Sequence, residues 1–131
     1  MKSISPMCFG CEPLGGTDWG DIDVKSIERA VHTALDLGIN FFDTAGVYGL
    51  GLSEKRLSRI LGSRRTEVFI ATKGGLSWTK SSFGRSDIVK DSSKQAIRRD
   101  VESSLKRLRL EALPIFYVHW PDPSTKIQDT F

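Results

Sequence analysis

The chain alternates short apolar runs with longer segments in which apolar residues recur at helical spacing. The short runs are typical of buried strands in a parallel sheet, and the longer segments predict amphipathic helices. Strands are expected over residues 6–11, 39–43, 67–73 and 114–119, and helices over residues 23–37, 53–62 and 92–110. The order is therefore strand, helix, strand, helix, strand, helix, strand, and a further turn or helix follows the last strand.

Polar residues and glycines mark the ends of these segments. Asp21 or Asp23 is expected to cap the first helix, and Gly38 suits its C-terminal end. Ser53 is expected to cap the second helix. We expect residues 74–87, GGLSWTKSSFGRSD, to form a polar loop, and loops of that length are usually functional or mobile.

Strands that alternate with helices in this way favour an α/β fold with a parallel sheet covered by helices. The segments present are about half of a parallel (β/α)8 TIM-type barrel, which needs about 250 residues. A doubly wound open sheet is the competing architecture, and it normally has a GxGxxG loop directly after its first strand. The glycines of residues 10–16, GCEPLGG, do not match that loop. The half barrel is therefore the favoured fold.

At 131 residues the chain is long enough for one domain, and its 39% hydrophobic and 27% charged residues are typical of a globular protein. The net charge of +3 and the pI near 9.0 are only mildly basic, so no nucleic-acid partner is expected. Basic residues concentrate in residues 56–65 and 94–109, both within helical patterns. A solvated helix face explains these clusters at least as well as phosphate binding does.

No apolar run is long enough to span a membrane, and the first ten residues lack the features of a signal peptide. The two cysteines, Cys8 and Cys11, form a CxxC pair, but neither a redox helix nor further zinc ligands accompany them at suitable spacing. We therefore expect two reduced, partly buried thiols, no bound metal and a reducing, cytoplasmic setting.

Three of the expected strands end in an ionisable residue, namely Asp43, Lys73 and His119. In a parallel α/β fold the carboxyl ends of the strands share one face, where active sites form. Tyr48 follows Asp43 in the loop above the same face. Each residue has a structural explanation by itself, since an Asp often caps a turn and a Lys can reach solvent. Their shared position instead indicates a proton-transfer group.

The chemistry of this group follows from its residue types. Tyrosine is a weak acid with an unperturbed pKa of about 10, and the Lys73 ammonium is expected to lower the pKa of Tyr48. Asp43 is expected to pair with Lys73 and keep it in place. A neutral His119 can hydrogen-bond a carbonyl oxygen and orient it toward the Tyr48 hydroxyl, which protonates the alkoxide formed by hydride transfer.

Three stretches, GINFFDTAGVYGLGLSEKRLSRILG, VFIATKGG and YVHWPDP, resemble the aldo-keto reductase superfamily. The resemblance covers essentially the whole chain and implies a (β/α)8 barrel that uses NADPH, less often NADH, without a metal. The activity implied is the reversible reduction of a small aldehyde or ketone to an alcohol. The family's tetrad of Asp, Tyr, Lys and His matches Asp43, Tyr48, Lys73 and His119.

The same resemblance implies roles for residues around the tetrad. Gly10 and Cys11 lie where the first strand approaches the nicotinamide of the cofactor, and Asp43 also contacts the cofactor in the family. Trp120, directly after the histidine, is a candidate for the apolar wall of the substrate pocket. Trp78 is expected to pack within a loop.

The resemblance also implies that residues 1–131 are the N-terminal half of the barrel domain. In the family, the second half supplies most of the residues that bind the dinucleotide. A half barrel has open strand edges and uncovered apolar side chains. The alternatives are a truncated sequence, which is favoured, a homo-oligomer that covers those edges, and one half of a split protein. The alternative function is a catalytically inactive half barrel that self-associates or binds a partner.

Overall fold

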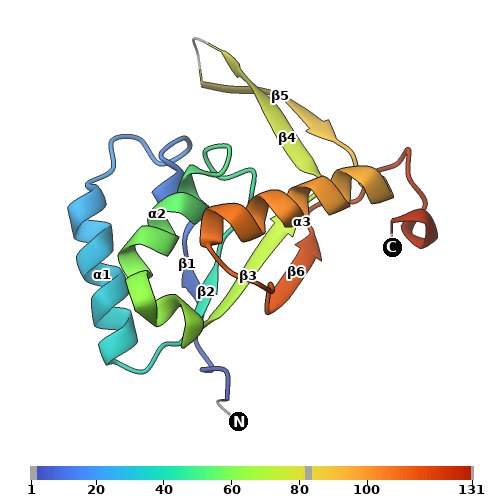
Figure 1. Cartoon of the computed structure of the whole chain (residues 1–131). Helices are drawn as coiled ribbons and strands as arrows, with labels where there is room; N and C mark the ends of the chain where they lie inside the picture. Colours follow the sequence, from blue (N-terminus) through green and yellow to red (C-terminus); the bar gives the residue numbers. More distant parts are fainter. Residues whose placement is uncertain (1–2, 82–83, 131) are drawn as a thin grey trace.

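The computed structural model describes residues 3–81 and 84–130, in which helices cover one face of a parallel sheet (Figure 1). The sheet contains, in this order, β1 (Phe9–Gly10), β2 (Phe41–Asp43), β3 (Phe69–Gly74) and β6 (Ile115–Val118), and neighbouring strands are parallel. The helices are α1 (Val24–Asp36), α2 (Leu52–Leu61) and α3 (Lys94–Leu108). The expected parallel α/β architecture is therefore confirmed.

All four strands of the parallel sheet begin later than the apolar pattern predicts, the second at Phe41 rather than residue 39 and the fourth at Ile115 rather than residue 114. The first strand begins at Phe9 rather than residue 6, and the third begins at Phe69 rather than residue 67. The chain before β3 forms the short 3-10 turn η2 (Gly62–Thr66). A further 3-10 turn, η3 (Ile127–Asp129), follows β6 at the place where a turn or helix was expected.

The core lies between the sheet and the helices because alternate strand residues point to opposite faces of a sheet. Phe42 and Ile70 are fully buried on the helix side. They pack with apolar residues of all three helices, namely Val31, Leu35, Leu57, Ile60, Leu61 and Leu108. Asp43, Ala71 and Lys73 alternate with these core residues along the strands. The charged side chains therefore point to the face opposite the core.

The expected cap is present on α1 but not on α2. The Asp23 carboxylate accepts a hydrogen bond of 3.0 Å from the backbone N–H of Lys25 and caps α1. Ser53 does not cap α2, because Gly51 occupies the cap position with a φ of +89°. The Ser53 hydroxyl lies in the core and donates to the Cys11 carbonyl at 2.6 Å. A buried hydroxyl needs such a partner, and this one joins α2 to the chain after β1.

Residues 76–81 and 84–87 of the polar stretch 74–87, expected to be a loop, instead belong to an antiparallel hairpin of β4 (Leu76–Ser81) and β5 (Gly84–Lys90). Residues 82 and 83 lie outside the described residues. The hairpin projects away from the parallel sheet (Figure 1). Trp78 is buried between two exposed residues, so a strand-like alternation is present. This alternation covers too few residues to distinguish a strand from a loop in the sequence. The exposed parts of a projecting hairpin require no apolar side chains, so the pattern is not continued there.

Two glycines bring the 3-10 turn η1 (Glu12–Gly15) into contact with the loop that carries Tyr48. A Cβ atom added to Gly49 would lie 2.2 Å from the Gly15 carbonyl oxygen. One added to Gly15 would lie 2.8 Å from the carbonyl carbon of Tyr48. Gly49 also has a φ of +61°, which side chains disfavour. The two backbones therefore touch directly, and their contact positions the backbone at Tyr48.

Gly49→Ala is expected to destabilise the chain by about 3 kcal/mol, because the new methyl group meets backbone atoms that no side-chain rotation can move. Urea denaturation measures the free energy of unfolding. Gly20→Ala is the matched control, since Gly20 has a similar φ of +64° but no atom within 4 Å of an added Cβ. The control is expected to lose only about 1 kcal/mol. Equal losses in the two variants would show that the contact with η1 is not stabilising.

Candidate active site

The carboxyl ends of the parallel strands bring the expected site residues to one edge of the sheet. Gly10 is the register partner of Asp43 between β1 and β2. Lys73 lies one residue before the end of β3. His119 directly follows β6, and its backbone N–H donates to the Gly74 carbonyl at 2.9 Å. The structure therefore places Asp43, Lys73 and His119 at the same edge, as their strand positions predict.

The Lys73 ammonium donates hydrogen bonds to three oxygen atoms. Its Nζ atom lies 2.6 Å from Asp43 Oδ2, 2.9 Å from the Thr44 carbonyl oxygen and 3.3 Å from the Tyr48 hydroxyl. The three N–H groups of the ammonium are therefore all used. The Lys73 side chain is only 15% exposed, and a cation in that position requires the opposite charge of Asp43. Lys73 is thus positioned between the carboxylate and the phenol.

Tyr48 and His119 place a phenol and an imidazole next to each other. Their ring centroids are 5.7 Å apart, and the rings meet edge to face at 81°. The Lys73 Nζ atom lies 5.0 Å from the centroid of the Tyr48 ring. The four expected residues therefore form one cluster, in which Lys73 contacts Asp43 and Tyr48 and the Tyr48 ring contacts His119.

The pKa of Tyr48 is raised from its ordinary value of 10.0, and the expectation of a lowered pKa is wrong. Burial is the largest cause, because it disfavours the charged phenolate. Lys73 acts in the opposite direction through its charge and its hydrogen bond, and the negative charge of Asp43 offsets part of that effect. Tyr48 therefore keeps its proton at neutral pH.

Trp78 connects the base of the hairpin to the loop that carries Tyr48. The indole Nε1 of Trp78 donates to the Val47 carbonyl at 2.9 Å, as a buried indole N–H requires. Ala45, Val47 and Trp78 form a small buried cluster, and Tyr48 packs against it. Trp78 thus belongs to β4 rather than to a loop, and it packs against the loop that carries Tyr48.

A buried ion pair lies behind Lys73, on the helix side of the sheet. Glu54 of α2 is fully buried and forms an ion pair with Arg107 of α3. Its carboxylate also accepts a hydrogen bond of 2.6 Å from the Thr72 hydroxyl of β3. Thr72 directly precedes Lys73, so the two side chains point to opposite faces of the sheet. The ion pair therefore anchors both helices to the strand that carries Lys73.

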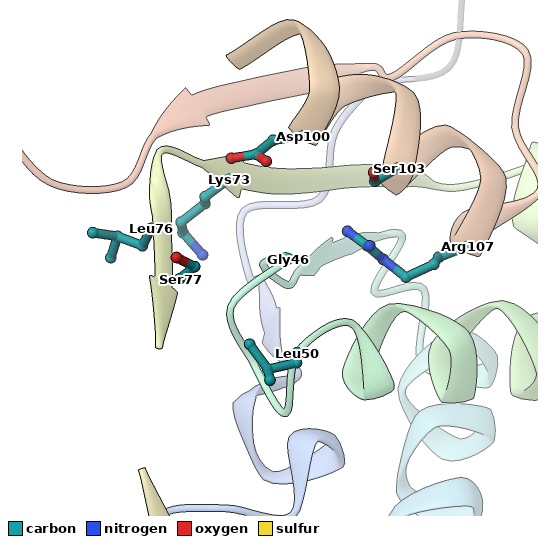
Figure 2. A pocket seen from close by; sticks show the side chains of 8 residues that line it. All are labelled: Gly46, Leu50, Lys73, Leu76, Ser77, Asp100, Ser103 and Arg107. Atoms are coloured by element: carbon teal, nitrogen blue, oxygen red, sulfur yellow. The ribbon is translucent and has the colours of Figure 1, made fainter. Parts of the chain in front are cut away.

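A cavity of about 150 Å³ lies between α3, the Tyr48 loop and the start of the hairpin (Figure 2). Figure 2 shows Lys73 and Arg107 extending toward Gly46 from opposite sides. A Cβ atom on Gly46 would lie 3.1 Å from Arg107 Nη2, so this glycine leaves room for the guanidinium group. Pockets for small-molecule ligands usually measure about 300–1,000 Å³. This cavity is therefore too small to be the cofactor site.

The two residues expected at the nicotinamide differ in accessibility. Gly10 has no atom within 4 Å of an added Cβ, so the end of β1 is open to a planar ring. The Cys11 side chain is buried in the core, and burial raises the pKa of its thiol. Only the backbone of Cys11 can therefore face a ligand. Both cysteines are free, but Cys8 is exposed and Cys11 is fully buried, which corrects the expectation that both are partly buried.

Trp120 lies beside the tetrad and is accessible. Its ring centroid is 6.1 Å from that of His119, and 40% of the residue is exposed. The Lys90 ammonium of β5 lies 5.6 Å from the Trp120 ring centroid. Trp120 is thus placed between His119 and the hairpin, and its role in a substrate pocket stays a prediction.

The Glu54–Arg107 ion pair was not predicted, although the sequence contains a signal for it. Glu54, Leu57 and Leu61 recur at helical spacing, so they share one face of α2. Leu57 and Leu61 belong to the core, which places Glu54 in the core as well. A carboxylate on a buried face predicts a buried cation opposite it, but the pattern does not indicate which of the many basic residues supplies it.

Two further findings concern the described residues 3–81 and 84–130. They contain no group of three or more His, Cys, Asp or Glu side chains arranged to bind a metal ion. None of the helices in this part of the chain combines the length and apolar character needed to cross a membrane.

The comparison of sequences relates this chain to known enzymes. The model of the Aldo/keto reductase family matches residues 6–131. The chain is 36% identical over 124 residues to the aldo-keto reductase YhdN of Bacillus subtilis. This alignment covers 93% of this chain and 36% of that protein. It is 35% identical over 119 residues to L-galactose dehydrogenase of Arabidopsis thaliana, covering 88% of this chain and 34% of that protein.

Solved structures show the same relation in three dimensions. The glycerol dehydrogenase AKR11B4 of Gluconobacter oxydans superposes with a TM-score of 0.81 at 39% identity, covering 94% of this chain and 38% of that one. The holo form of aldo-keto reductase AKR11C1 of Bacillus halodurans gives a TM-score of 0.80 at 31% identity. The match covers 97% of this chain and 40% of that one. The chain thus spans well under half the length of these relatives, and its sheet is part of a TIM-type barrel, as expected.

Glu54→Ala is expected to destabilise the chain by about 3–5 kcal/mol, because it leaves the Arg107 guanidinium partly buried without its counter-ion. The loss is measured as the change in the free energy of unfolding in urea. Glu102→Ala is the control, since Glu102 pairs with Arg98 at 3.8 Å and both side chains are exposed. That exposed pair should contribute less than about 1 kcal/mol. A small loss in both variants would contradict the anchoring role of Glu54.

Proposed function

The chain belongs to the aldo/keto reductase family, and from that premise we propose that it carries the catalytic group of an NAD(P)H-dependent reductase. The reaction is the reversible conversion of an aldehyde or ketone to an alcohol. The observation that carries the proposal is the position of Lys73, whose ammonium contacts both the Asp43 carboxylate and the Tyr48 hydroxyl. A protonated phenol beside a fixed cation is suited to protonate a carbonyl oxygen.

Tyr48 is proposed as the general acid. Its hydroxyl gives a proton to the carbonyl oxygen as a hydride reaches the carbonyl carbon, so that the C=O bond becomes a C–O bond with new C–H and O–H bonds. The Lys73 ammonium, 3.3 Å from the hydroxyl oxygen, stabilises the phenolate that remains until water reprotonates it. Asp43 keeps the ammonium in place, and His119 donates a hydrogen bond that orients the carbonyl oxygen toward Tyr48.

NADPH, or alternatively NADH, would supply the hydride when bound. Gly10, the backbone of Cys11 and Asp43 are proposed to border its nicotinamide ring. Two observations support this fit, since the end of β1 is open at Gly10 and the Asp43 side chain is 31% exposed. The family relation favours NADPH, and one of the similar solved structures is described as a holo form.

The proposed reaction also suggests roles for Trp120, for the chain as a domain and for the two free thiols. Trp120 is proposed as one wall of a pocket for a small carbonyl substrate or its alcohol product, since it is accessible beside His119. Residues 1–131 are proposed as the N-terminal half of the barrel domain. The free thiols of Cys8 and Cys11 support a reducing compartment such as the cytoplasm.

The open edges of the sheet favour a second candidate function. Within the described residues, β1 pairs only with β2 and β6 only with β3, so each outer strand has unpaired backbone groups. Such edges suit a half barrel that self-associates or binds a partner without catalysing a reaction. Size-exclusion chromatography with light scattering and an NADPH titration separate the two candidates. Saturable NADPH binding favours the reductase, and a dimer that binds no NADPH favours the module.

Tyr48→Phe is expected to lower the rate of aldehyde reduction by about a hundredfold or more, because the phenylalanine has no proton to donate. The rate is followed as NADPH oxidation at saturating aldehyde. Tyr117→Phe is the matched control, since it removes the hydroxyl of the only other tyrosine, which lies on β6 and is half-exposed. It should retain the original rate. Equal rates for the original chain and Tyr48→Phe would overturn the assignment of the acid.

The pH profile of the reduction is the second expected outcome. The acid must carry its proton, and the pKa of Tyr48 is raised above its ordinary 10.0. We therefore expect kcat/KM to be independent of the Tyr48 ionisation through about pH 9 and to fall only above about pH 10. Lys73→Met removes the ammonium that lowers this pKa, so the fall should move to still higher pH. A fall centred near neutral pH that follows Tyr48 would contradict the proposal.

A further inference from the structure

A groove on the helix layer is lined by five basic side chains. It has a volume of about 450 Å³ and lies between α2 and α3, which pack beside each other (Figure 1). We define the basic groove by its lining residues, Lys55, Arg59, Lys106, Arg107 and Arg109. No acidic residue is among those that line it.

Most of these cations have no counter-ion in the part of the chain that the structure describes. Arg107 is paired with the buried Glu54. Ion pairs within residues 3–81 and 84–130 involve none of the other four side chains, Lys55, Arg59, Lys106 and Arg109. Basic residues elsewhere on the helix layer, such as Arg29, Arg64 and Arg98, each lie within 4.0 Å of a carboxylate oxygen. Single basic residues outside the groove, such as Lys25 and Lys94, also have no ion pair within the described residues, so the groove differs by gathering five basic side chains with no acidic residue among them.

Helix electrostatics explain only part of this arrangement. Arg59 lies in the last turn of α2, and Lys106 and Arg107 lie in the last turn of α3, where cations are favoured. Lys55 lies near the N-terminal end of α2, where the helix dipole disfavours a cation. It nevertheless faces the same groove as Arg59, one helical turn away. Gathering these like charges costs free energy that a bound anion would offset.

We propose that the basic groove binds a small anion with several phosphate groups. Guanidinium groups bind phosphate oxygens through two parallel N–H groups, and the two lysines add positive charge. The volume of about 450 Å³ lies within the range of about 300–1,000 Å³ that is usual for small-molecule sites. Four of its cations have no ion pair within the described residues, and their charge matches that of a chain of two or three phosphates.

Arg107 connects the basic groove to the rest of the structure. It lines both the groove and the cavity of about 150 Å³ that is also bordered by Lys73. A bound anion would therefore share this guanidinium group with Glu54. Arg107 is unsuitable for a binding test, because its loss would leave the buried Glu54 carboxylate unpaired.

The test uses tripolyphosphate as the probe, with the 131-residue chain in low salt and without NADPH or aldehyde. Isothermal titration calorimetry measures the affinity of the original chain and of the double variant Arg59→Gln/Lys106→Gln, whose altered residues are exposed. The control is Lys25→Gln/Lys94→Gln, which removes two charges that are also exposed but lie outside the groove. Circular dichroism establishes that all three proteins are folded.

We expect one tripolyphosphate per chain, with affinity reduced by about tenfold or more in the groove variant and by about twofold or less in the control. Equal weakening in both double variants would overturn the proposal, because general surface charge would then account for binding. If tripolyphosphate binding to the original chain does not saturate, the proposal is also overturned.

A parallel titration with ATP identifies the source of the phosphates. Tighter binding than that of tripolyphosphate indicates a nucleotide, and weaker or equal binding indicates the phosphate chain alone. Because no step requires reductase activity, the result is independent of the proposed function.

Discussion

The buried contact among Glu54, Arg107 and Thr72 is the constraint on which the rest of the structure depends. A fully buried carboxylate is tolerated only when a cation and hydrogen-bond donors satisfy it, so α2 and α3 cannot shift separately on the sheet. Thr72 joins this contact to β3, and Lys73 is the next residue on the opposite face. The same strand thus connects the packing of the helices to the position of the ammonium group in the site.

The proposed acid, Tyr48, is positioned by a different set of contacts. Tyr48 lies in a loop, and loops need outside contacts to reach the precision that proton transfer requires. Gly15 and Gly49 bring the backbone of η1 against one side of this loop, and Trp78 hydrogen-bonds the Val47 carbonyl. The sheet therefore supplies the charged partners, whereas the turn and the hairpin hold the loop that carries the proposed acid.

The parts that the sequence predicts best are those with a strong local pattern. The carboxyl ends of three strands were located to within one residue, because apolar runs that end in Asp43, Lys73 and His119 indicate where parallel strands stop. The strand β2 ends at Asp43, β3 ends one residue after Lys73, and β6 ends one residue before His119. The hairpin was missed, because a projecting element has few core contacts and therefore little apolar alternation. Ser53 was misplaced, since a helix-capping serine and a buried serine look alike until the Cys11 carbonyl is known to lie nearby.

Electrostatic quantities were the least predictable part of the site. The neighbouring Lys73 was correctly inferred to act on Tyr48, but the sign of the net pKa shift depends on burial, which no local pattern reports. The pairing of Glu54 with Arg107 could not be predicted from a local pattern either, because the two residues are far apart in the sequence. Long-range contacts between charged groups are specified by the packing of helices, and only the structure gives that packing.

The hairpin has a consequence for protein engineering. Its connection to the loop is made at the base, through Trp78, and the register of the two strands shifts directly after that residue. Beyond this irregularity the strands project away from the sheet (Figure 1). Projecting segments with few contacts to the core accept insertions well. The outer hairpin can therefore receive a foreign peptide, such as an affinity epitope, while Trp78 continues to support the loop beneath it.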